Sequence, residues 1–297
     1  MERIGELAAI ATALCWTTGS LFFERGIKRI GVLSANFIKV VIAFILLTIT
    51  ATIIRGMPLP FDAPAHTLFV LTLSGIVGFL ITDMFLFSAY NTAGPRITML
   101  FMALSPLITA VIAYLFLGES IGQRGGLGMA LVLSGIIITV FARQGGISFL
   151  KIDNTDRLGY IFALFACIGQ SIGMVLAKAG IGDYDPVSGT QIRIFAAVVG
   201  FAIASLIFKK GEGIKKALKN PEGLKYTLVG SFFGPFLGVT LSLFAIQRVS
   251  TGIVSTLIGL TPILIIIPEL LIFKKKIKPM EIAGALVAVS GTAVFFL

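Results

Sequence analysis

The sequence predicts an all-α integral membrane protein with ten transmembrane helices, arranged as two inverted five-helix repeats. Three observations support this fold class: the composition, a series of long apolar runs, and a match between the two halves. Of the 297 residues, 57% are hydrophobic and 13% are charged, whereas a soluble domain has about 25% charged residues. Mean hydropathy is +1.01. This composition excludes an ordinary water-soluble protein.

Apolar runs follow one another along the whole chain. A helix needs about 20 apolar residues to cross the hydrocarbon core of a bilayer. Short connections rich in Gly, Pro, Asn and charged residues separate the runs, as is typical of turns at a membrane surface. In order, the runs cover residues 5–23, 33–54, 67–89, 96–117, 125–142, 158–178, 187–208, 224–246, 250–273 and 279–297.

The first run and the longest connection each have a specific interpretation. The run is longer than the apolar region of a signal peptide and no small-residue cleavage site follows, so we expect it to be the first transmembrane helix. Residues 209–225 predict a short amphipathic helix on the membrane surface, too short for a domain. Cys15 and Cys167 fall inside predicted helices and are expected to be small buried residues, not a disulfide framework.

The two halves of the sequence match. Three glycines recur after 154 positions: Gly5, Gly19 and Gly26 correspond to Gly159, Gly173 and Gly180. Further along the offset is 156, and Pro106, Gly128 and Gly135 correspond to Pro262, Gly284 and Gly291. The match predicts one repeat over residues 1–143 and a second over 157–297.

An odd number of helices per repeat has a geometric consequence. Five helices end on the membrane face opposite the one where they began, so the second repeat inserts inverted. Inverted repeats suit a protein with two exchangeable faces and favour secondary transport over a merely enlarged bundle. The alternative is a membrane sensor or a lipid-handling bundle that transports nothing.

The most specific stretch is LSPLITAVIAYLFLGESIGQRGGLGMALVLSGIIITVF, with a proline in the fourth run, Leu-Gly-Glu at its end and a Gly-rich fifth run. It resembles the EamA family of the drug/metabolite transporter superfamily, and the resemblance covers nearly the whole chain. The resemblance implies transport of a small metabolite, amino acid or drug through a central cavity lined mainly by spans 1, 3, 4, 6, 8 and 9. Pro106 has its counterpart in Pro262, but the position equivalent to Glu119 in the second half is Lys275.

Asp83, Lys39 and Arg193 lie inside apolar runs, where a charge is expected to face the bundle interior or water. Asp83 is the first candidate, either as a group that exchanges a proton or binds a cationic substrate, or as half of an ion pair with Lys39 or Arg193 that locks the bundle. Lys39 and Arg193 occupy matched positions near opposite membrane faces. Each is expected to extend to the headgroups or to a loop carbonyl, or else to serve as a substrate or gating residue.

The first and sixth runs each carry a polar helical face, and these faces predict a shared substrate cavity. Trp16 and Gln170 are its pseudo-equivalent residues, with Ser20 and Met174 on the same faces. Glu24 and Lys178 lie near helix ends on opposite sides of the membrane and are candidate gates or ordinary interface charges.

Further candidates lie at the end of the third run and within the fourth and ninth runs. Tyr90 and Met102 are expected to line the same cavity. Pro106 and Pro262 are expected to bend their helices and serve as hinges.

Other functions lack their motifs. The sequence has no GxxxxGK[ST] loop for ATP, and a single histidine, His66, with two separated cysteines predicts no metal site. We therefore expect no enzyme and no cofactor. The net charge of +10 comes from short loops, which favours anionic lipids over nucleic acid. Besides lipids, the expected partner is a small-molecule substrate, and a homodimer is compatible with the sequence.

Two arguments about orientation disagree. If the N-terminus were cytoplasmic, the loops and ends on that side would hold five basic residues and the opposite loops 17. The positive-inside rule therefore favours both termini outside. The resemblance implies both termini inside.

Overall fold

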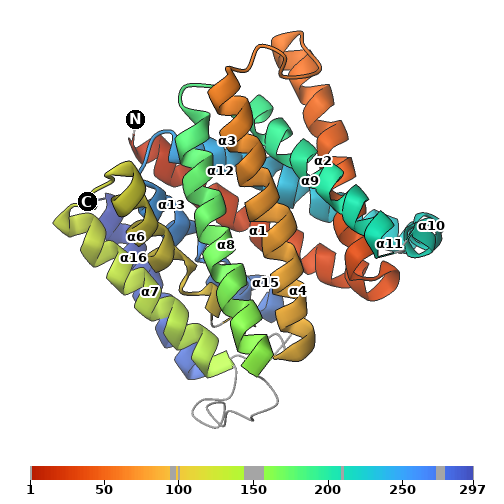
Figure 1. The fold of residues 1–297 in the computed structure, drawn as a ribbon. Helices are drawn as coiled ribbons and strands as arrows, with labels where there is room; N and C mark the ends of the chain where they lie inside the picture. Colours follow the sequence, from red (N-terminus) through yellow and green to blue (C-terminus); the bar gives the residue numbers. More distant parts are fainter. Residues whose placement is uncertain are drawn as a thin grey trace.

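The computed structural model describes residues 2–93, 98–99, 101–143, 157–208, 211–271 and 278–296. All regular secondary structure in these ranges is helical (Figure 1). The first half contains α1 (Glu2–Ile30), α2 (Val32–Arg55), α3 (Ala65–Gly75), the π-helix η1 (Ile76–Ile81), α4 (Thr82–Thr92), α6 (Ser105–Leu117) and α7 (Gln123–Arg143). The second half contains α8 (Arg157–Ile181), α9 (Pro186–Ile207), α10 (Gly211–Leu218), α11 (Pro221–Ser231), the π-helix η4 (Phe232–Gly238), α12 (Val239–Ile246), α13 (Thr251–Ile258), α14 (Thr261–Leu264), α15 (Ile266–Leu271) and α16 (Pro279–Phe296).

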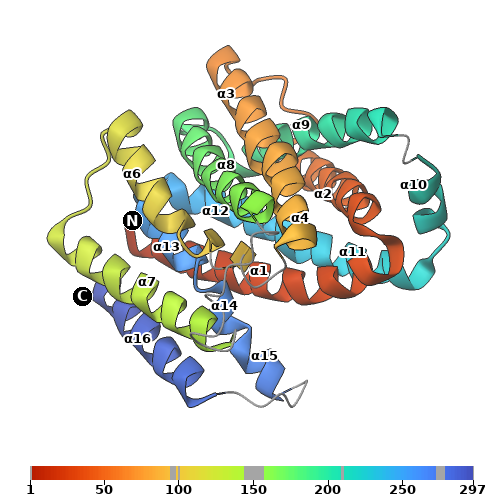
Figure 2. The same cartoon turned by 60° about the horizontal axis from the view of Figure 1, so that its bottom comes forward.

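The helices identify a multi-pass membrane protein. Among the described residues, eight helical stretches are long and apolar enough to cross a membrane, and two shorter apolar helices cover Ser105–Leu117 and Pro279–Phe295. The amphipathic helix expected within 209–225 is present as α10, which lies at the opposite edge of the bundle from α7 and α16 (Figures 1 and 2).

Local chemistry sets several helix ends. Gly56 ends α2 and Gly118 ends α6, each in the left-handed region with φ of 70° and 65°, where glycine has no Cβ penalty. At the start of α9, the Asp185 side chain accepts a hydrogen bond from the Ser188 N–H at 2.8 Å, and Pro186 occupies the first turn.

The π-helices interrupt the third and eighth apolar runs at matched positions. In η4, Pro235 removes a backbone donor. Behind η1, the Thr82 hydroxyl donates to the Val77 carbonyl at 2.8 Å and so satisfies an acceptor. Both segments carry a glycine at a helix crossing: Gly78 in η1 and Gly234 in η4.

The first helix of each half packs against the other half. α1 contacts α11, η4, α12 and α13, whereas α8 contacts α3, η1, α4 and α6. Glycines allow the close approach: a Cβ on Gly19 would lie 3.2 Å from the Gly234 nitrogen, and one on Gly173 would lie 2.6 Å from the Gly78 Cα. Such small-residue contacts drive helix association in lipid, where the hydrophobic effect between helices is absent.

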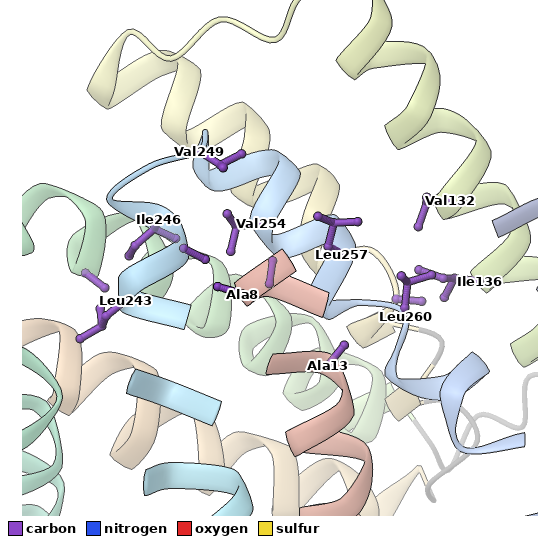
Figure 3. Close-up of a cluster of buried hydrophobic side chains, with 14 of the residues drawn as sticks. Ala8, Ala13, Val132, Ile136, Leu243, Ile246, Val249, Val254, Leu257 and Leu260 are labelled. Carbon is purple, nitrogen blue, oxygen red and sulfur yellow. The ribbon is translucent and has the colours of Figure 1, made fainter. Parts of the chain in front are cut away.

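Two further pairs complete the bundle. α2 packs against α9, and α7 packs against α16, with which it forms one edge (Figure 2). The largest apolar cluster joins α1, α7, α12 and α13, and Figure 3 shows Ala13, Ile136, Leu243 and Leu257 among its side chains. This cluster fixes the first helix against the segments that carry several of the candidate residues.

Candidate functional site

Asp83 on α4 forms an ion pair with Lys39 on α2. The Lys39 ammonium donates to the Asp83 Oδ2 at 3.2 Å, and the two side chains are 13% and 14% exposed. The ammonium also lies 5.5 Å from the ring centroid of Phe23 on α1. Of the alternatives for Lys39, the structure therefore has the pairing with Asp83 and not an extension to the headgroups.

Arg193 on α9 is buried, and among the residues that the structure describes it has no carboxylate partner. Arg193 is 5% exposed, and its guanidinium carbon lies 5.0 Å from the Phe79 ring centroid. The Arg193 Nε has no hydrogen-bond partner among the described residues. Nη2 lies 3.4 Å from the position that a Cβ on Gly78 would occupy. The side chain thus points into the bundle toward η1, and the expectation that it extends to the headgroups is wrong.

The polar faces of α1 and α8 differ in their surroundings. Trp16 is half-buried, and its indole nitrogen lies 3.3 Å from where a Cβ on Gly238 would be, so that glycine makes room for the ring. Ser20 is half-buried and donates to the Thr17 carbonyl at 2.8 Å. Gln170 is exposed, and Met174 packs against the large apolar cluster.

Helix breaks precede both prolines that the sequence singled out. A turn at residues 103–104 precedes α6, and Pro106 lies in the first turn of that helix. Pro262 likewise begins α14 after a turn that follows α13. Met102 is half-buried just before the first break. The side chain of Tyr90 lies outside the described residues, and so does Lys275.

A pair of hydroxyl contacts ties the first helices to these breaks. The Ser171 hydroxyl on α8 donates to the Ser105 carbonyl at 3.1 Å. In the other half, the Thr17 hydroxyl on α1, which donates to the Ala13 carbonyl at 2.8 Å, also lies 3.5 Å from the Thr261 carbonyl. Each carbonyl belongs to the residue before the proline. Sequence reasoning did not find this pairing, although the offsets of 154 and 156 positions relate both members of one contact to those of the other.

Lys178 and Glu119 meet at the end of the bundle that holds the start of α1. Lys178 Nζ lies 3.7 Å from Glu119 Oε1, and it donates to the Ile246 carbonyl and, at 3.5 Å, to the Val249 carbonyl. Glu119 accepts from the Thr251 N–H at 2.6 Å and from its hydroxyl at 3.0 Å. We call this group the Lys178 clasp; it joins α8, the α6–α7 connection and the start of α13.

A second polar group bridges the two halves at the same end. Arg55 binds Asp62 and Ser188, and the Tyr184 hydroxyl donates to the Asp62 Oδ1 at 2.9 Å. The hydrogen bond from Arg55 holds the pKa of Asp62 below its ordinary value, and burial raises the pKa of Tyr184. Gln247 adds bonds of 2.8 Å to the Gly182 and Tyr184 carbonyls. The α2–α3 connection is thereby fixed to the start of α9.

The opposite end has more exposed pairs. Glu24 is 62% exposed and pairs with Lys28 on the same helix at 2.6 Å. Arg29 pairs with the exposed Glu222 of α11 at 2.7 Å. Glu24 and Lys178 therefore lie at different ends of the bundle and have different partners.

A groove in the structure is lined by none of the charged side chains named above. It has a volume of about 740 Å³ and lies between α2, α3, α9 and the α2–α3 connection. Its walls are almost entirely apolar, with side chains such as Leu68, Ile76, Phe195 and Val199. Within the described ranges, no group of three or more His, Cys, Asp or Glu side chains is placed to hold a metal ion.

Comparisons with known proteins agree with this architecture. The model of the EamA-like transporter family matches residues 3–141 and 157–297. Among the solved structures that match, a chain titled "Crystal structure of protein" has a TM-score of 0.78 and 18% sequence identity over 99% of this chain and 97% of that chain. This likeness concerns the fold. The comparison with curated proteins found no match.

The family match covers both halves almost completely. Members of the family are membrane transporters and not enzymes. The chain belongs to the EamA-like transporter family.

Proposed function

We propose that this chain is a secondary transporter that moves a small metabolite, amino acid or drug-like solute by alternating access. Ten transmembrane helices form two inverted repeats, over residues 1–143 and 157–297. The observation that carries the proposal is the exchange of first helices, because α1 packs against the third and fourth spans of the second half and α8 against those of the first. A bundle of this kind can rock about a shared central site.

Contacts between equivalent helices support the inversion. A Cβ on Gly128 of α7 would lie 3.1 Å from the Gly291 carbonyl of α16, and one on Gly135 would meet the Gly284 carbonyl. The residue numbers rise along α7 as they fall along α16, so the two helices run antiparallel. Since they are the last helices of the two repeats, antiparallel packing is what inverted insertion produces.

The substrate site in this proposal lies between α1 and α8. Trp16, Ser20, Gln170 and Met174 line it from these helices, and Tyr90 and Met102 extend it. The helix breaks at Pro106 and Pro262 act as the hinges. The hydroxyls of Ser171 and Thr17 support this role, because they hold the carbonyls beside both hinges to the moving first helices.

The gates lie at the two ends. The Lys178 clasp closes the end that holds the start of α1, and Glu24 is its counterpart at the other end. In the described state the clasp is formed, whereas Glu24 is exposed and pairs with Lys28 of its own helix. This asymmetry supports a state that is closed at the end of the clasp.

Coupling is assigned to the Asp83–Lys39 pair. A proton on Asp83 would neutralise the carboxylate and release Lys39, which changes the contact between α2 and α4. Arg193 holds the matched position in the second repeat. The 3.2 Å contact between these largely buried side chains supports this use, because a buried ion pair responds strongly to the loss of one charge.

Uptake into liposomes tests the function. Purified protein receives a mixed pool of amino acids, nucleosides and organic cations, with and without a pH gradient, and mass spectrometry identifies what enters. We expect uptake of one solute class that follows the gradient, and loss of the gradient dependence in Asp83→Asn. The control is Glu222→Gln, which removes an exposed acid paired with Arg29.

The outcomes separate the alternatives. Gradient-independent uptake that Asp83→Asn leaves unchanged removes the coupling role and keeps the transporter. The absence of any uptake by folded protein favours a sensor or a lipid-handling bundle.

The orientation we propose follows the charge bias, with both termini outside. Single cysteines at positions 65 and 213, introduced as Ala65→Cys and Gly213→Cys, test it with a membrane-impermeant maleimide on intact cells. Labelling at 65 alone supports the proposal. Labelling at 213 alone reverses it and agrees with the orientation implied by the family resemblance.

A further inference from the structure

Lys39 and Arg193 are equivalent by sequence but not by environment. They lie 154 positions apart in the matched second helices of the two halves. Lys39 has a carboxylate partner, Asp83, at 3.2 Å. Arg193 has the face of Phe79 at 5.0 Å and no ion pair with any residue that the structure describes.

The missing partner can be located from the repeat. In the third and eighth spans the offset between equivalent positions is 156, since Gly78 and Gly234 meet the matched glycines Gly173 and Gly19. The position equivalent to Asp83 is therefore Val239. That residue is 3% exposed and belongs to the same apolar cluster as Phe79. An apolar side chain thus occupies the place where the first repeat has its carboxylate.

A buried guanidinium without a counterion is costly, and the membrane interior makes it more so. The Phe79 ring compensates only part of this cost. Among the described residues a second buried ionisable side chain is incompletely satisfied: Glu6 is 7% exposed, and its Oε2 has no hydrogen-bond partner. Its neighbour Gly5 packs against Val249 at the end of the bundle, so Glu6 lies with the Lys178 clasp and not with Arg193.

We infer that Arg193 binds the anionic group of the transported solute, a carboxylate or a phosphate. The inference rests on the proposed function and adds the substrate class. The planar guanidinium presents donors in a fork that matches both anions. Nη2 lies beside Gly78, at the crossing of η1 with Gly173 of α8. On α8, Gln170 and Met174 of the proposed substrate site lie within one turn of Gly173.

The pairing of Arg193 with the anionic group of the solute explains the difference between the repeats. In the first repeat the protein itself supplies the negative charge, on Asp83. In the second repeat the solute supplies the negative charge, so that the neutral arrangement of both repeats exists only when the solute is bound. Binding of the anion thereby makes the two halves electrically alike.

Anion binding to the purified full-length protein tests the inference without transport. The melting temperature in detergent is followed while inorganic phosphate, acetate or succinate replaces chloride at constant ionic strength. We expect a saturable rise with at least one of these probes. In Arg193→Gln the dissociation constant should rise by about 10-fold or more, as the loss of a hydrogen bond to a charged group implies.

Val239→Asp provides the second variant, because it supplies an internal carboxylate and keeps the arginine. This variant should abolish the response to the probes. Arg29→Gln is the matched control, since Arg29 is an arginine paired with the exposed Glu222, and it should respond like the wild type. A wild-type response in both Arg193→Gln and Val239→Asp, or no saturable response of the wild type to any of the three anions, overturns the inference.

The transport assay then separates this inference from the proposed function. The liposome pool is extended with dicarboxylates and phosphate esters. Uptake confined to neutral or cationic solutes, equal in wild type and Arg193→Gln, overturns the anion site and leaves the transporter standing. Absence of all uptake by wild-type protein that binds phosphate or a carboxylate through Arg193 removes the transporter and keeps the anion site.

Discussion

The two halves of the molecule have matched packing residues and unmatched charges. Gly19 and Gly173 each lie at a crossing with a glycine of the other half. Both hinge candidates begin a helix after a turn, and in both halves a hydroxyl of the first helix binds the carbonyl before that proline. By contrast, Asp83 corresponds to Val239 and Glu119 to Lys275.

This difference separates two kinds of constraint. Close helix crossings in lipid require small residues in both halves, because a side chain at the contact would push the backbones apart. Charges follow no such rule, and each half can carry its own. The matched glycines and prolines therefore define the scaffold. The unmatched charges make the two halves of the molecule, and its two ends, chemically different.

The largest effect is expected when Lys39 loses its partner Asp83, because only the first half has such an ion pair among the described residues. Asp83→Asn leaves Lys39 without its partner and should destabilise the protein by about 3–5 kcal/mol, as for other buried pairs that lose one member. Thermal unfolding in detergent measures the change. The double substitution of Lys39→Met with Asp83→Leu should recover most of the stability, because an apolar pair of similar volume needs no counterion.

The double variant also distinguishes a locking role from coupling. Recovered stability with recovered transport would mean that the pair only locks the bundle. Recovered stability without gradient-dependent transport is the result expected for coupling. Equal stability of Asp83→Asn and wild type would contradict the geometry of the pair.

A smaller effect is expected at the matched glycine crossings, which differ in how closely the two helix backbones approach. Gly173→Ala places a Cβ 2.6 Å from the Gly78 Cα, so the backbones must separate, at a cost of about 1–3 kcal/mol. Gly19→Ala meets its nearest atom at 3.2 Å and should cost less. Unfolding of the two variants, compared side by side, measures the difference. The reverse order would show that the α1 crossing is the tighter one.

The sequence predicts the membrane class and the positions of the apolar runs because hydropathy and length suffice for both. It does not predict the breaks within the runs in full. Pro106 and Pro262 indicate two of them, but η1 contains no proline and its register depends on how Gly78 meets Gly173. The first helix also extends to Ile30, beyond the apolar run, because exposed charged residues such as Glu24 and Lys28 continue it.

The candidate site is predicted as a set of residues but not as a set of contacts. Asp83, Lys39 and Arg193 are conspicuous because each is a charge in an apolar run, yet the sequence leaves both pairings open. Lys178 and Glu119 stand in separate sequence patterns, and their meeting depends on how α8 packs against α6. A repeat assigns equivalent positions within the halves, whereas such contacts arise between the halves and require the structure.

The Lys178 clasp closes one end of the bundle, and a change in Glu119 should weaken it. Glu119→Gln removes the negative charge opposite Lys178 and weakens the acceptor for the Thr251 N–H. We expect a loss of about 1 kcal/mol, as for a helix cap, concentrated at the start of α13. Amide hydrogen exchange of residues 246–254 should accelerate by about 5-fold, the factor that this energy implies. Glu212→Gln on the exposed surface of α10 is the control and should leave these amides unchanged.

The smallest effect is expected from acid at the second polar group of the same end. Because Arg55 lowers the pKa of Asp62 in the folded protein from its ordinary value of 3.8, this carboxylate contributes stability above the unfolded pKa, and the contribution is lost as the pH falls through the folded pKa. Asp62 is solvent-accessible, so screening keeps the contribution small. Asp62→Asn should therefore lower the melting temperature slightly at neutral pH and converge with the wild type in acid. A constant difference between the two proteins from neutral pH down to acid would show that Tyr184 and Ser188 hold Arg55 without help from the carboxylate, and that this end depends less on charge than the Lys178 clasp does.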